Sequence, residues 1–420
     1  MSESPYAALK IADFRLLLIS RLLVTVAVQV QCIAVGWQIY ALTHNPLDLG
    51  LAGLAEALPN IAVALYAGHV ADQVDRRKIA MSAVAVLVLS LAILTYCSYT
   101  QGQNPALLAI IYSVIALTGL ARGFYGPAIF SIIADIVPRE HYGNAAAWNA
   151  TVWQSSALAG PVIGGFLYGY YLAPLTYLVS TLLLVGAFFC FYTVKSRSAI
   201  PEKTNDSIIE NIKEGLRFVF NHQILLAAMA LDLFAVLFGG AVALLPMFAK
   251  EVFHMGPQVL GMLRAAPSLG AVIIAFILTH RPLSKNSGAW LLASVATFGA
   301  CMIAFGLSTN FYVSLALLAL SGAVDGVSVW VRSTIFQLVT PNDMKGRVSA
   351  VNNIFIGSSN EIGEFESGVA AKLLGLVPSV VFGGCMTLLV VITTLFKAPK
   401  LRSLHVESLY KDYKPTSPLG

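Results

Sequence analysis

Charged residues are scarce in this chain. Only 11% of its 420 residues are Asp, Glu, Lys or Arg, whereas 57% are hydrophobic; about one quarter of the residues are charged in a typical soluble domain. This shortage excludes an ordinary water-soluble globular protein. The mean hydropathy of +0.77 predicts instead a polytopic membrane protein.

Motifs for enzymatic or metal chemistry are also lacking. The seven histidines form no metal-spaced cluster, and the chain has no nucleotide-binding glycine loop and no Ser or Cys nucleophile motif. The five cysteines stand singly in apolar stretches, without metal or disulfide spacing: Cys32, Cys97, Cys190, Cys301 and Cys385. We expect packing roles for these cysteines, and we expect no enzyme, no bound metal and no cofactor.

Long apolar runs are abundant. About 20 apolar residues in a helix span the ~30 Å hydrocarbon core of a bilayer. The polar first residues show no signal-peptide pattern, so we expect no removable signal peptide and a permanent first span. The sequence predicts an all-α fold with twelve transmembrane helices, near 13–43, 47–70, 79–100, 104–137, 140–170, 173–194, 222–252, 257–280, 288–308, 310–340, 343–372 and 377–397.

Basic residues lie mainly at one end of these predicted helices. Of the 26 Lys and Arg, 20 lie at this end, four lie inside helices, and only Lys250 and Lys372 lie at the other end. Lys and Arg are enriched in cytoplasmic loops, so we expect both termini in the cytoplasm. The net charge of +5 reflects this bias, and we expect the lipid bilayer, and no nucleic acid, as a partner.

A polar segment at 195–221 divides the chain near its middle. Ser207 and Glu210 form a capping-box pattern, and Ile208, Ile212 and Leu216 recur at helical spacing. This pattern predicts an amphipathic helix on the cytoplasmic membrane surface; a solvated linker is the alternative. The predicted parts are a six-helix bundle at 1–195, a linker at 196–221, a second six-helix bundle at 222–398 and a cytoplasmic tail at 399–420.

The two halves resemble each other. A shift of 203 residues aligns Gly119 with Gly322 and Pro138 with Pro341, and it aligns SSALAGPVIGG at 155–165 with SSNEIGEFESG at 358–368. Parallel six-helix repeats about an axis normal to the membrane are a transporter design, with the site at the repeat interface. We therefore predict two pseudo-symmetric bundles.

Ionisable side chains occur in eight of the predicted helices, and the spans near 79–100, 173–194, 288–308 and 377–397 lack acidic and basic residues apart from the terminal Lys397. A charge at the bilayer centre costs roughly 2.5–3.5 kcal/mol on the mildest scale, so these groups must face partners or water. The sequence thus predicts four lipid-facing helices and a central polar cavity, lined by helices with Arg21, Glu56, Arg122, Asp232, Arg264, Asp325, Arg332, Glu361, Glu364 and Glu366.

The repeat gives these charges a pattern. A shift of 211 residues places Arg21 on the position of Asp232, and the shift of 203 places Arg122 on that of Asp325. Two arrangements follow. Opposite charges meet across the pseudo-twofold axis, or each charge pairs within its own half.

The loop GHVADQVDRRK at 68–78 resembles the signature G-x-L-A-D-R-x-G-R-R/K of the major facilitator superfamily. The matching residues are Gly68, Asp72, Arg76 and Arg77, whereas Gln73 and Asp75 depart from the signature. The resemblance implies the major facilitator fold and a cytoplasmic gate. In that gate the aspartate would lie at the N-terminus of the helix that begins near 341–343, because the positive end of the helix dipole stabilises a negative charge.

The stretch SALAGPVIGG at 156–165 resembles an exporter-associated motif of the same superfamily, through Gly160, Pro161, Gly164 and Gly165. Small residues let helices approach closely, and we expect Pro161 to bend the helix. The stretches FYGPAIFSIIADIVPREH, LLPMFAKEVF and GRVSAVNNIF are similar to the enterobactin-exporter-like branch. Arg122 matches the buried arginine that this superfamily associates with proton transfer.

This resemblance implies a monomeric, multi-pass secondary transporter of the bacterial cytoplasmic (inner) membrane, working by alternating access and driven by a proton gradient. We expect export of a small amphipathic or anionic molecule, siderophore-like or drug-like. An importer and a carboxylate-liganded divalent-cation exporter are the alternatives. A non-transporting membrane receptor or scaffold is a remote alternative, because such a protein needs neither buried carboxylates nor a gate motif.

Burial in an apolar cavity favours the protonated form of a carboxylate, so buried acids are candidates for proton coupling. Glu361 and Glu364 share one helical face, whereas Glu366 points away, toward an outer aqueous vestibule. The full set of coupling candidates is Glu361, Glu364, Glu56, Asp232, Asp325 and Arg122.

Arginines and aromatic rings of the cavity helices are candidates for binding the substrate, through charge or stacking. Each ring has packing as its alternative role. The candidates are Arg21, Arg122, Arg332, Trp330, Phe124, Tyr125, Phe234 and Trp37.

Overall fold

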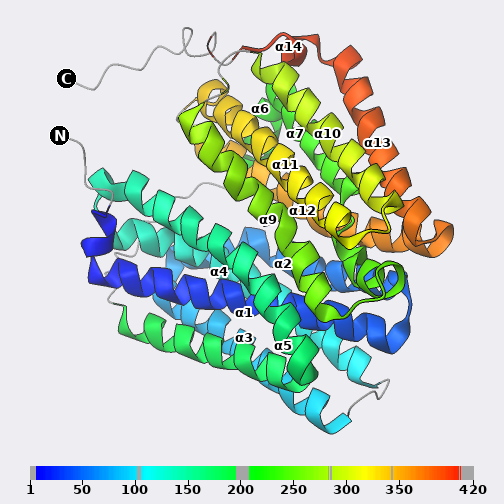
Figure 1. Ribbon diagram of the computed structural model, residues 1–420. Helices are drawn as coiled ribbons and strands as arrows, with labels where there is room; N and C mark the ends of the chain where they lie inside the picture. The colour runs from blue at the N-terminus through cyan, green and yellow to red at the C-terminus, as the bar shows by residue number, and fades with distance from the viewer. Residues whose placement is uncertain are drawn as a thin grey trace. The chain divides into compact units, whose positions relative to one another are not determined.

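The computed structural model describes residues 6–101, 106–194, 208–281, 283, 286–341, 344–405 and 407. Within this part of the chain all regular structure is helical (Figure 1). Nine segments of the described residues are long and apolar enough to cross a membrane. The predicted all-α membrane fold is therefore confirmed.

The first compact unit comprises Met1–Thr204 and Ala243–Ala265. It contains α1 (Ala12–Thr43), α2 (Pro46–Gln73), α3 (Arg76–Gln101), α4 (Ala106–Ile136) and α5 (Tyr142–Thr193). Helix α1 packs along α5, α2 along α4, and α3 against both α4 and α5. Asn45 fixes the start of α2, because its side chain accepts a hydrogen bond from the Leu47 amide at 3.2 Å and Pro46 occupies the first turn.

Helix α5 is 52 residues long and covers two of the predicted spans. Its backbone leaves helical angles at Leu172 (φ 63°, ψ −178°), and Pro161, where we expected a bend, is not such a break. The predicted number of twelve spans is reached when α5 is counted twice and the more polar helices α2 and α12 (Lys345–Leu374) are included. These two helices have 28 and 30 residues, and they carry Glu56 and the three predicted glutamates.

The span predicted at 222–252 is not one helix. Helix α7 (Gln223–Gly239) ends before Gly240, whose ψ of 92° is extended. A 3-10 turn, η3 (Val242–Leu244), a short helix, α8 (Leu245–Met247), and a π-helical turn, η4 (Phe248–Val252), follow. The glycine pair and Pro246 explain the interruption, because neither residue type supports a helix interior. The part after the break belongs to the first unit.

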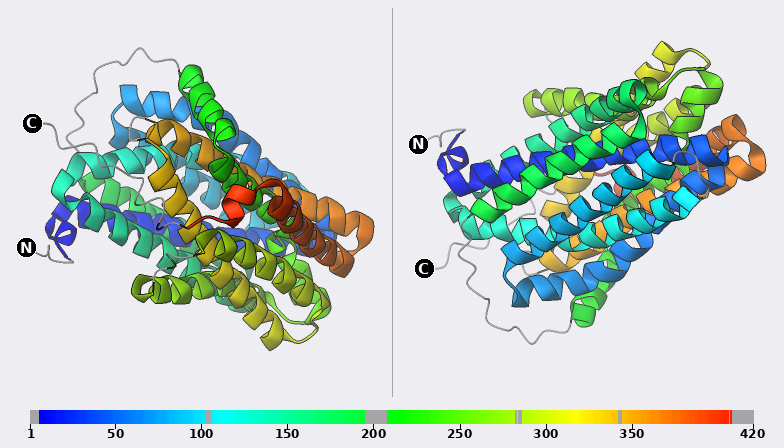
Figure 2. Two further views of the ribbon diagram at one scale, coloured as in Figure 1. Left: turned by 90° about the horizontal axis from the view of Figure 1, so that it is seen from above. Right: turned by 90° about the horizontal axis from the view of Figure 1, so that it is seen from below.

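The second compact unit comprises Asn205–Val242 and Ala266–Gly420. Helix α9 (Pro257–His280) runs from the first unit into the second. The other helices of the second unit are α6 (Ile208–Asn221), α7, α10 (Ser287–Leu307), α11 (Phe311–Val339), α12, α13 (Leu376–Lys397) and α14 (Pro399–Arg402). Helix α10 packs on α11 and α13, and α7 packs on α12 and α13. Figure 2 shows these helices from two further sides.

Helix α6 is the predicted amphipathic helix, but protein covers part of its apolar face. Val219 is fully buried in the core of the second unit, and Leu216 packs on that core. Gly215 lies against the backbone of Arg347 on α12, and Arg347 pairs with Glu214. The end of α6 therefore packs on protein, and its role on the membrane surface stays a prediction; the side chains of Ile208 and Ile212 lie outside the description.

Candidate functional site

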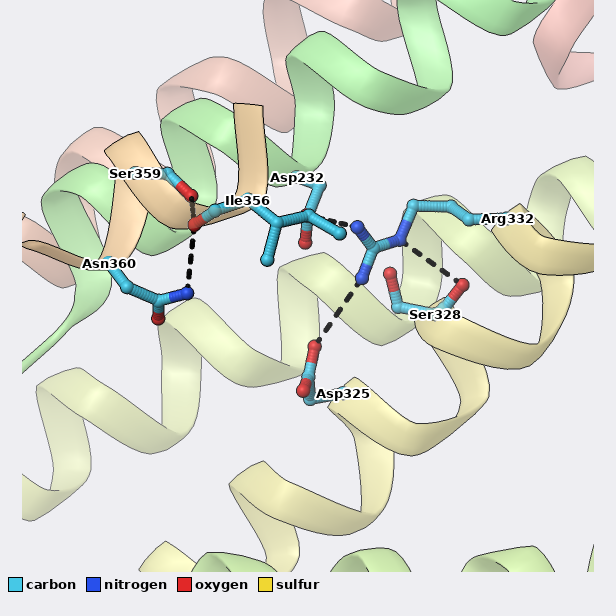
Figure 3. Close-up of polar contacts among 7 residues, drawn as sticks. All are labelled: Asp232, Asp325, Ser328, Arg332, Ile356, Ser359 and Asn360. Carbon is cyan, nitrogen blue, oxygen red and sulfur yellow. Dashed lines mark hydrogen bonds and ion pairs between the residues drawn. The ribbon is translucent and has the colours of Figure 1, made fainter. Parts of the chain in front are cut away.

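An acidic cluster around one arginine lies inside the second unit (Figure 3). Arg332 on α11 forms an ion pair with Asp232 on α7, and its other terminal nitrogen lies 3.9 Å from Asp325, about two turns earlier on α11. The Asp232 and Arg332 side chains are 10% and 15% exposed, whereas Asp325 is 50% exposed. Arg332 also donates through Nε to the Ser328 carbonyl at 3.4 Å.

The charges in this cluster do not balance. One guanidinium faces two carboxylates, so the cluster has a net charge of −1 when both are ionised. Arg332 compensates the charge of the buried Asp232. Without this partner, the charge at that position would cost several kcal/mol. The excess charge falls on the more exposed Asp325. Binding one proton, or one cation, makes the cluster neutral.

Helix α12 brings the three predicted glutamates to the end of α7. Gly363 packs on the α7 backbone, where an added Cβ would lie 3.0 Å from the Leu237 carbonyl oxygen. Ser367 donates to the Gly240 carbonyl at 2.7 Å, at the break after α7. The glutamates are all partly buried: Glu361, Glu364 and Glu366. Their helix is thus fixed to the same α7 that carries Asp232.

A second ion pair lies inside the first unit. Arg122 on α4 pairs with Glu56 on α2. The two helices are in backbone contact at this level, because a Cβ on Gly119 would lie 2.9 Å from the Glu56 carbonyl carbon. Arg122 and Glu56 are 42% and 19% exposed, so this pair is accessible from solvent.

These two clusters bear on the two pairing schemes left open by the sequence. Asp232 and Asp325 both face Arg332 of their own unit, and Arg122 faces Glu56 of its own unit. Pairing within one half is thus observed for Asp232, Asp325 and Arg122, whereas Arg21 has no ion pair among the described residues. The sequence repeat placed opposite charges at equivalent positions but did not show which helices bring partners together.

Arg21 and Tyr125 lie on neighbouring helices of the first unit. Arg21 on α1 is half-buried and interacts electrostatically with Tyr125 on α4. The Tyr125 ring packs edge-on against Phe191 at 6.1 Å. Its hydroxyl is buried, with no hydrogen-bond partner among the described residues.

The two arginines of the gate motif hold the end of the first unit together. Arg76 pairs with Asp135 of α4 at 2.7 Å. Arg77 donates to the carbonyls of Phe191, at 2.9 Å, and Tyr192 at the end of α5. The side chains of Gly68 and Asp72 lie outside the description, so their predicted gate role stays a prediction. Sequence reasoning missed Asp135, although it is the only acid between 106 and 136.

The glycine motif of α5 makes the predicted close helix contacts. Gly160 and Gly164 face α1, where an added Cβ would lie 2.5 Å from Gln29 Cβ and 3.0 Å from Val30 Cα. Gly165 faces the start of α9, 2.6 Å from the Pro257 carbonyl oxygen by the same measure. Both Pro161 and Gly165 lie against Gly261. The motif therefore joins three helices of the first unit.

A polar cluster after the α7 break escaped the sequence reasoning. The Tyr40 hydroxyl donates to Glu251, and Lys250 Nζ lies 3.2 Å from His44 Nε2 and 5.5 Å from the Tyr40 ring centre. The signal was the Lys-Glu pair within the apolar stretch LLPMFAKEVF. A π-helical turn presents both side chains toward α1, and such turns are frequent at functional sites.

The predicted aromatic residues take different roles. Phe234 is 42% exposed and stacks on Phe238 at 6.3 Å, whereas Trp330 packs on the core of the second unit. Phe124 and Trp37 are partly buried. Packing is thus the observed role of Trp330, and Phe234 has an accessible ring.

Comparisons with known proteins agree with this architecture. The sequence model of a family described as transmembrane secretion effector matches residues 3–417. The chain is 23% identical over 391 residues to the multidrug efflux pump Tap of Mycolicibacterium fortuitum, covering 90% of this chain and 93% of that protein. It is 25% identical over 397 residues to the enterobactin exporter EntS of Shigella boydii, covering 93% and 92%. The structure of a D-xylose–proton symporter shares the fold, with a TM-score of 0.71 at 14% identity, covering 93% of this chain and 98% of that one.

Proposed function

Since the chain belongs to the transmembrane secretion effector family of the major facilitator superfamily, we propose that it is a proton-coupled exporter of a small amphipathic or anionic molecule. It is a multi-pass membrane transporter and not an enzyme. In the proposed mechanism the binding site opens alternately to each face of the membrane. A proton moves inward for substrate that moves outward.

Relatives and sequence motif support the outward direction. Two proteins that match over nine tenths of the chain are named as an efflux pump and an exporter. The exporter-associated motif of α5 is closely packed against α1 and α9. Siderophore-like and drug-like molecules are the substrate classes that these relatives suggest.

The observation that carries proton coupling is the sharing of Arg332 by two aspartates. Asp325 is the exposed member with uncompensated charge, so it can take up a proton while the Asp232–Arg332 pair stays intact. Glu361 and Glu364 on α12, and Glu56 beside Arg122, are further carboxylates in the proposed path. All three are partly buried in membrane helices.

The proposal includes a cellular setting. The excess of Lys and Arg at one end of the helices supports a cytoplasmic location for both termini. The relatives come from bacteria, and we assign the protein to the bacterial cytoplasmic membrane, as a monomer. The proton gradient across that membrane is the energy source.

Transport in inside-out membrane vesicles tests this function. We expect vesicles with an acidic lumen to accumulate a fluorescent aromatic dye, and a proton ionophore to abolish the accumulation. Asp325→Asn should reduce gradient-driven accumulation at least tenfold, yet retain dye exchange at equal pH, because exchange needs no net proton movement. Glu140→Gln is the control, since the Glu140 side chain is 72% exposed in the short 3-10 helix Arg139–His141 between α4 and α5.

Two results would contradict the proposal. Gradient-driven loss of dye from these vesicles would identify an importer. Full accumulation by Asp325→Asn would remove this residue from proton coupling, and the same assay on Glu361→Gln and Glu364→Gln would then locate the coupling group or exclude α12 as well.

A further inference from the structure

We propose that Arg21 and Tyr125 together form the subsite that binds the anionic group of the transported molecule. This inference rests on the proposed function and narrows its substrate class to molecules with a carboxylate, phenolate or phosphate-like group. Both residues belong to the first unit, and neither takes part in the ion pairs described above.

Arg21 is an arginine without a counter-ion in the described chain. It lies within a membrane helix and is half-buried, yet it forms no ion pair and no hydrogen bond with a described residue. By contrast, Arg76 and Arg122 of the same unit each have a carboxylate partner. A charge in a membrane helix is retained with a partner or with water, so the position of Arg21 can receive an anion from outside the chain.

Tyr125 is the second residue of the subsite, and its hydroxyl lacks a hydrogen-bond partner in the part of the chain that the structure describes. Its hydroxyl is buried without a described partner, while the edge-on contact with Phe191 fixes the ring. Buried polar groups in folded proteins are almost always hydrogen-bonded. A hydroxyl held rigidly in this state is therefore a preformed donor for a group that enters from elsewhere.

One shared hydrophobic cluster and one hydrogen bond place Arg21 and Tyr125 on the same stretch of the α1–α4 interface. Leu18 of α1 belongs to the cluster that Ile133 of α4 packs on, and Gln31 of α1 donates to Thr118 of α4 at 3.2 Å. The helices are thus antiparallel here. Arg21 lies between the two contacts on α1, and Tyr125 lies between them on α4.

The chemistry of this pair favours an anion over a neutral ligand. A guanidinium offers five N–H donors in a planar fork that matches carboxylate and phosphate oxygens. The phenol adds an O–H donor, and charge-assisted hydrogen bonds of this kind are about twice as strong as neutral ones. A water molecule can satisfy the hydroxyl, but it leaves the charge of Arg21 uncompensated.

Binding of two xanthene dyes in detergent tests the subsite. Fluorescein is an anion and rhodamine 123 is a cation with the same ring system. We expect the wild type to bind fluorescein more tightly in fluorescence anisotropy. Arg21→Gln should weaken fluorescein binding at least tenfold, Arg21→Lys less, and Tyr125→Phe about fivefold, with rhodamine 123 binding unchanged.

Tyr112→Phe is the matched control on the same helix. The Tyr112 hydroxyl already donates to the Asp48 carbonyl at 3.0 Å, so its loss should lower the melting temperature and leave fluorescein affinity unchanged. Tyr125→Phe should leave the melting temperature unchanged and lower the fluorescein affinity, because it removes a hydroxyl that has no partner in the described chain. This contrast keeps the test valid even if Arg21→Gln fails to fold.

Three results would overturn the inference. They are equal wild-type affinity for the two dyes, unchanged fluorescein affinity in both Arg21→Gln and Tyr125→Phe, or an equal loss for both dyes, which would indicate a structural role. Failure of the proposed function is a separate outcome. In that case vesicles move neither dye, while the detergent measurement still decides the subsite.

Discussion

The phenolic hydroxyl of Tyr40 donates a hydrogen bond to the carboxylate of Glu251, a residue 211 positions later in the chain. Together with the 3.2 Å contact between Lys250 and His44, it fastens the segment after the α7 break to the end of α1. Both contacts lie within one compact unit. The segment Ala243–Ala265 therefore depends on α1 for its position.

We expect Tyr40→Phe to destabilise the protein by roughly 1 kcal/mol, because it removes a hydrogen bond to a charged group that is itself exposed. The ring, only 1% exposed, should stay in place. Thermal unfolding in detergent measures the effect. Tyr99→Phe, at an 81% exposed position, is the control, and equal melting temperatures of the two variants would contradict the prediction.

Arg332→Gln should destabilise the second unit by about 3–5 kcal/mol, because Asp232 then loses its counter-ion in a buried position. The double variant Asp232→Asn/Arg332→Gln should regain most of this stability. Arg347→Gln is the comparison. Its pair with Glu214 is 34% and 57% exposed, so its loss should cost no more than about 1 kcal/mol. Similar losses for Arg332→Gln and Arg347→Gln would refute the assignment.

Gly119→Ala should destabilise the first unit by about 1–3 kcal/mol through overpacking. The new Cβ would lie 2.9 Å from the Glu56 carbonyl carbon and 3.1 Å from its Cα, so α2 must move away from α4, and Glu56 from Arg122. Gly126→Ala on the same helix meets no atom within 4 Å and should be neutral or stabilising by up to about 1 kcal/mol. Equal behaviour of the two variants in thermal unfolding would count against this contact.

Gly215→Ala should detach α6 from α12. Its Cβ would lie 2.7 Å from the Arg347 carbonyl oxygen, and backbone cannot give way as a flexible side chain can. We expect cleavage between 208 and 221 by a protease to become several-fold faster. Arg217→Ala, at an exposed position, should be cleaved at the wild-type rate; a wild-type rate for Gly215→Ala would mean that α6 is held by other contacts.

Much of the helical architecture could be predicted from the sequence, because a helix in lipid must be apolar over a fixed length. The span predicted at 257–280 coincides with α9, and that at 288–308 differs from α10 by one residue at each end. The break at Gly240 was missed because the residues on both sides are equally apolar, and hydropathy does not register a change in backbone angles. For α6, amphipathicity predicted an apolar face but not what covers it.

The candidate site was predictable as a set of residues but not as a set of contacts. Asp232, Asp325 and Arg332 stand out because charge is costly in a membrane helix. Their pairing depends on which helix faces lie next to each other in the folded protein. That arrangement follows from the packing of the whole unit. For the same reason Asp135 was missed, since nothing in its neighbourhood along the chain indicates that Arg76 lies opposite.

Helix α5 passes from one span to the next through a single residue, Leu172, and grips α1 on both sides of that point. Gly160 and Gly164 hold α1 at Gln29 and Val30, and Tyr177 donates to Gln38 at 2.7 Å. A tilt of α1 must therefore move the parts of α5 before and after Leu172 together, as one rigid body. Movement inside the first unit is then left to α2 and α4, the two helices that carry Glu56 and Arg122.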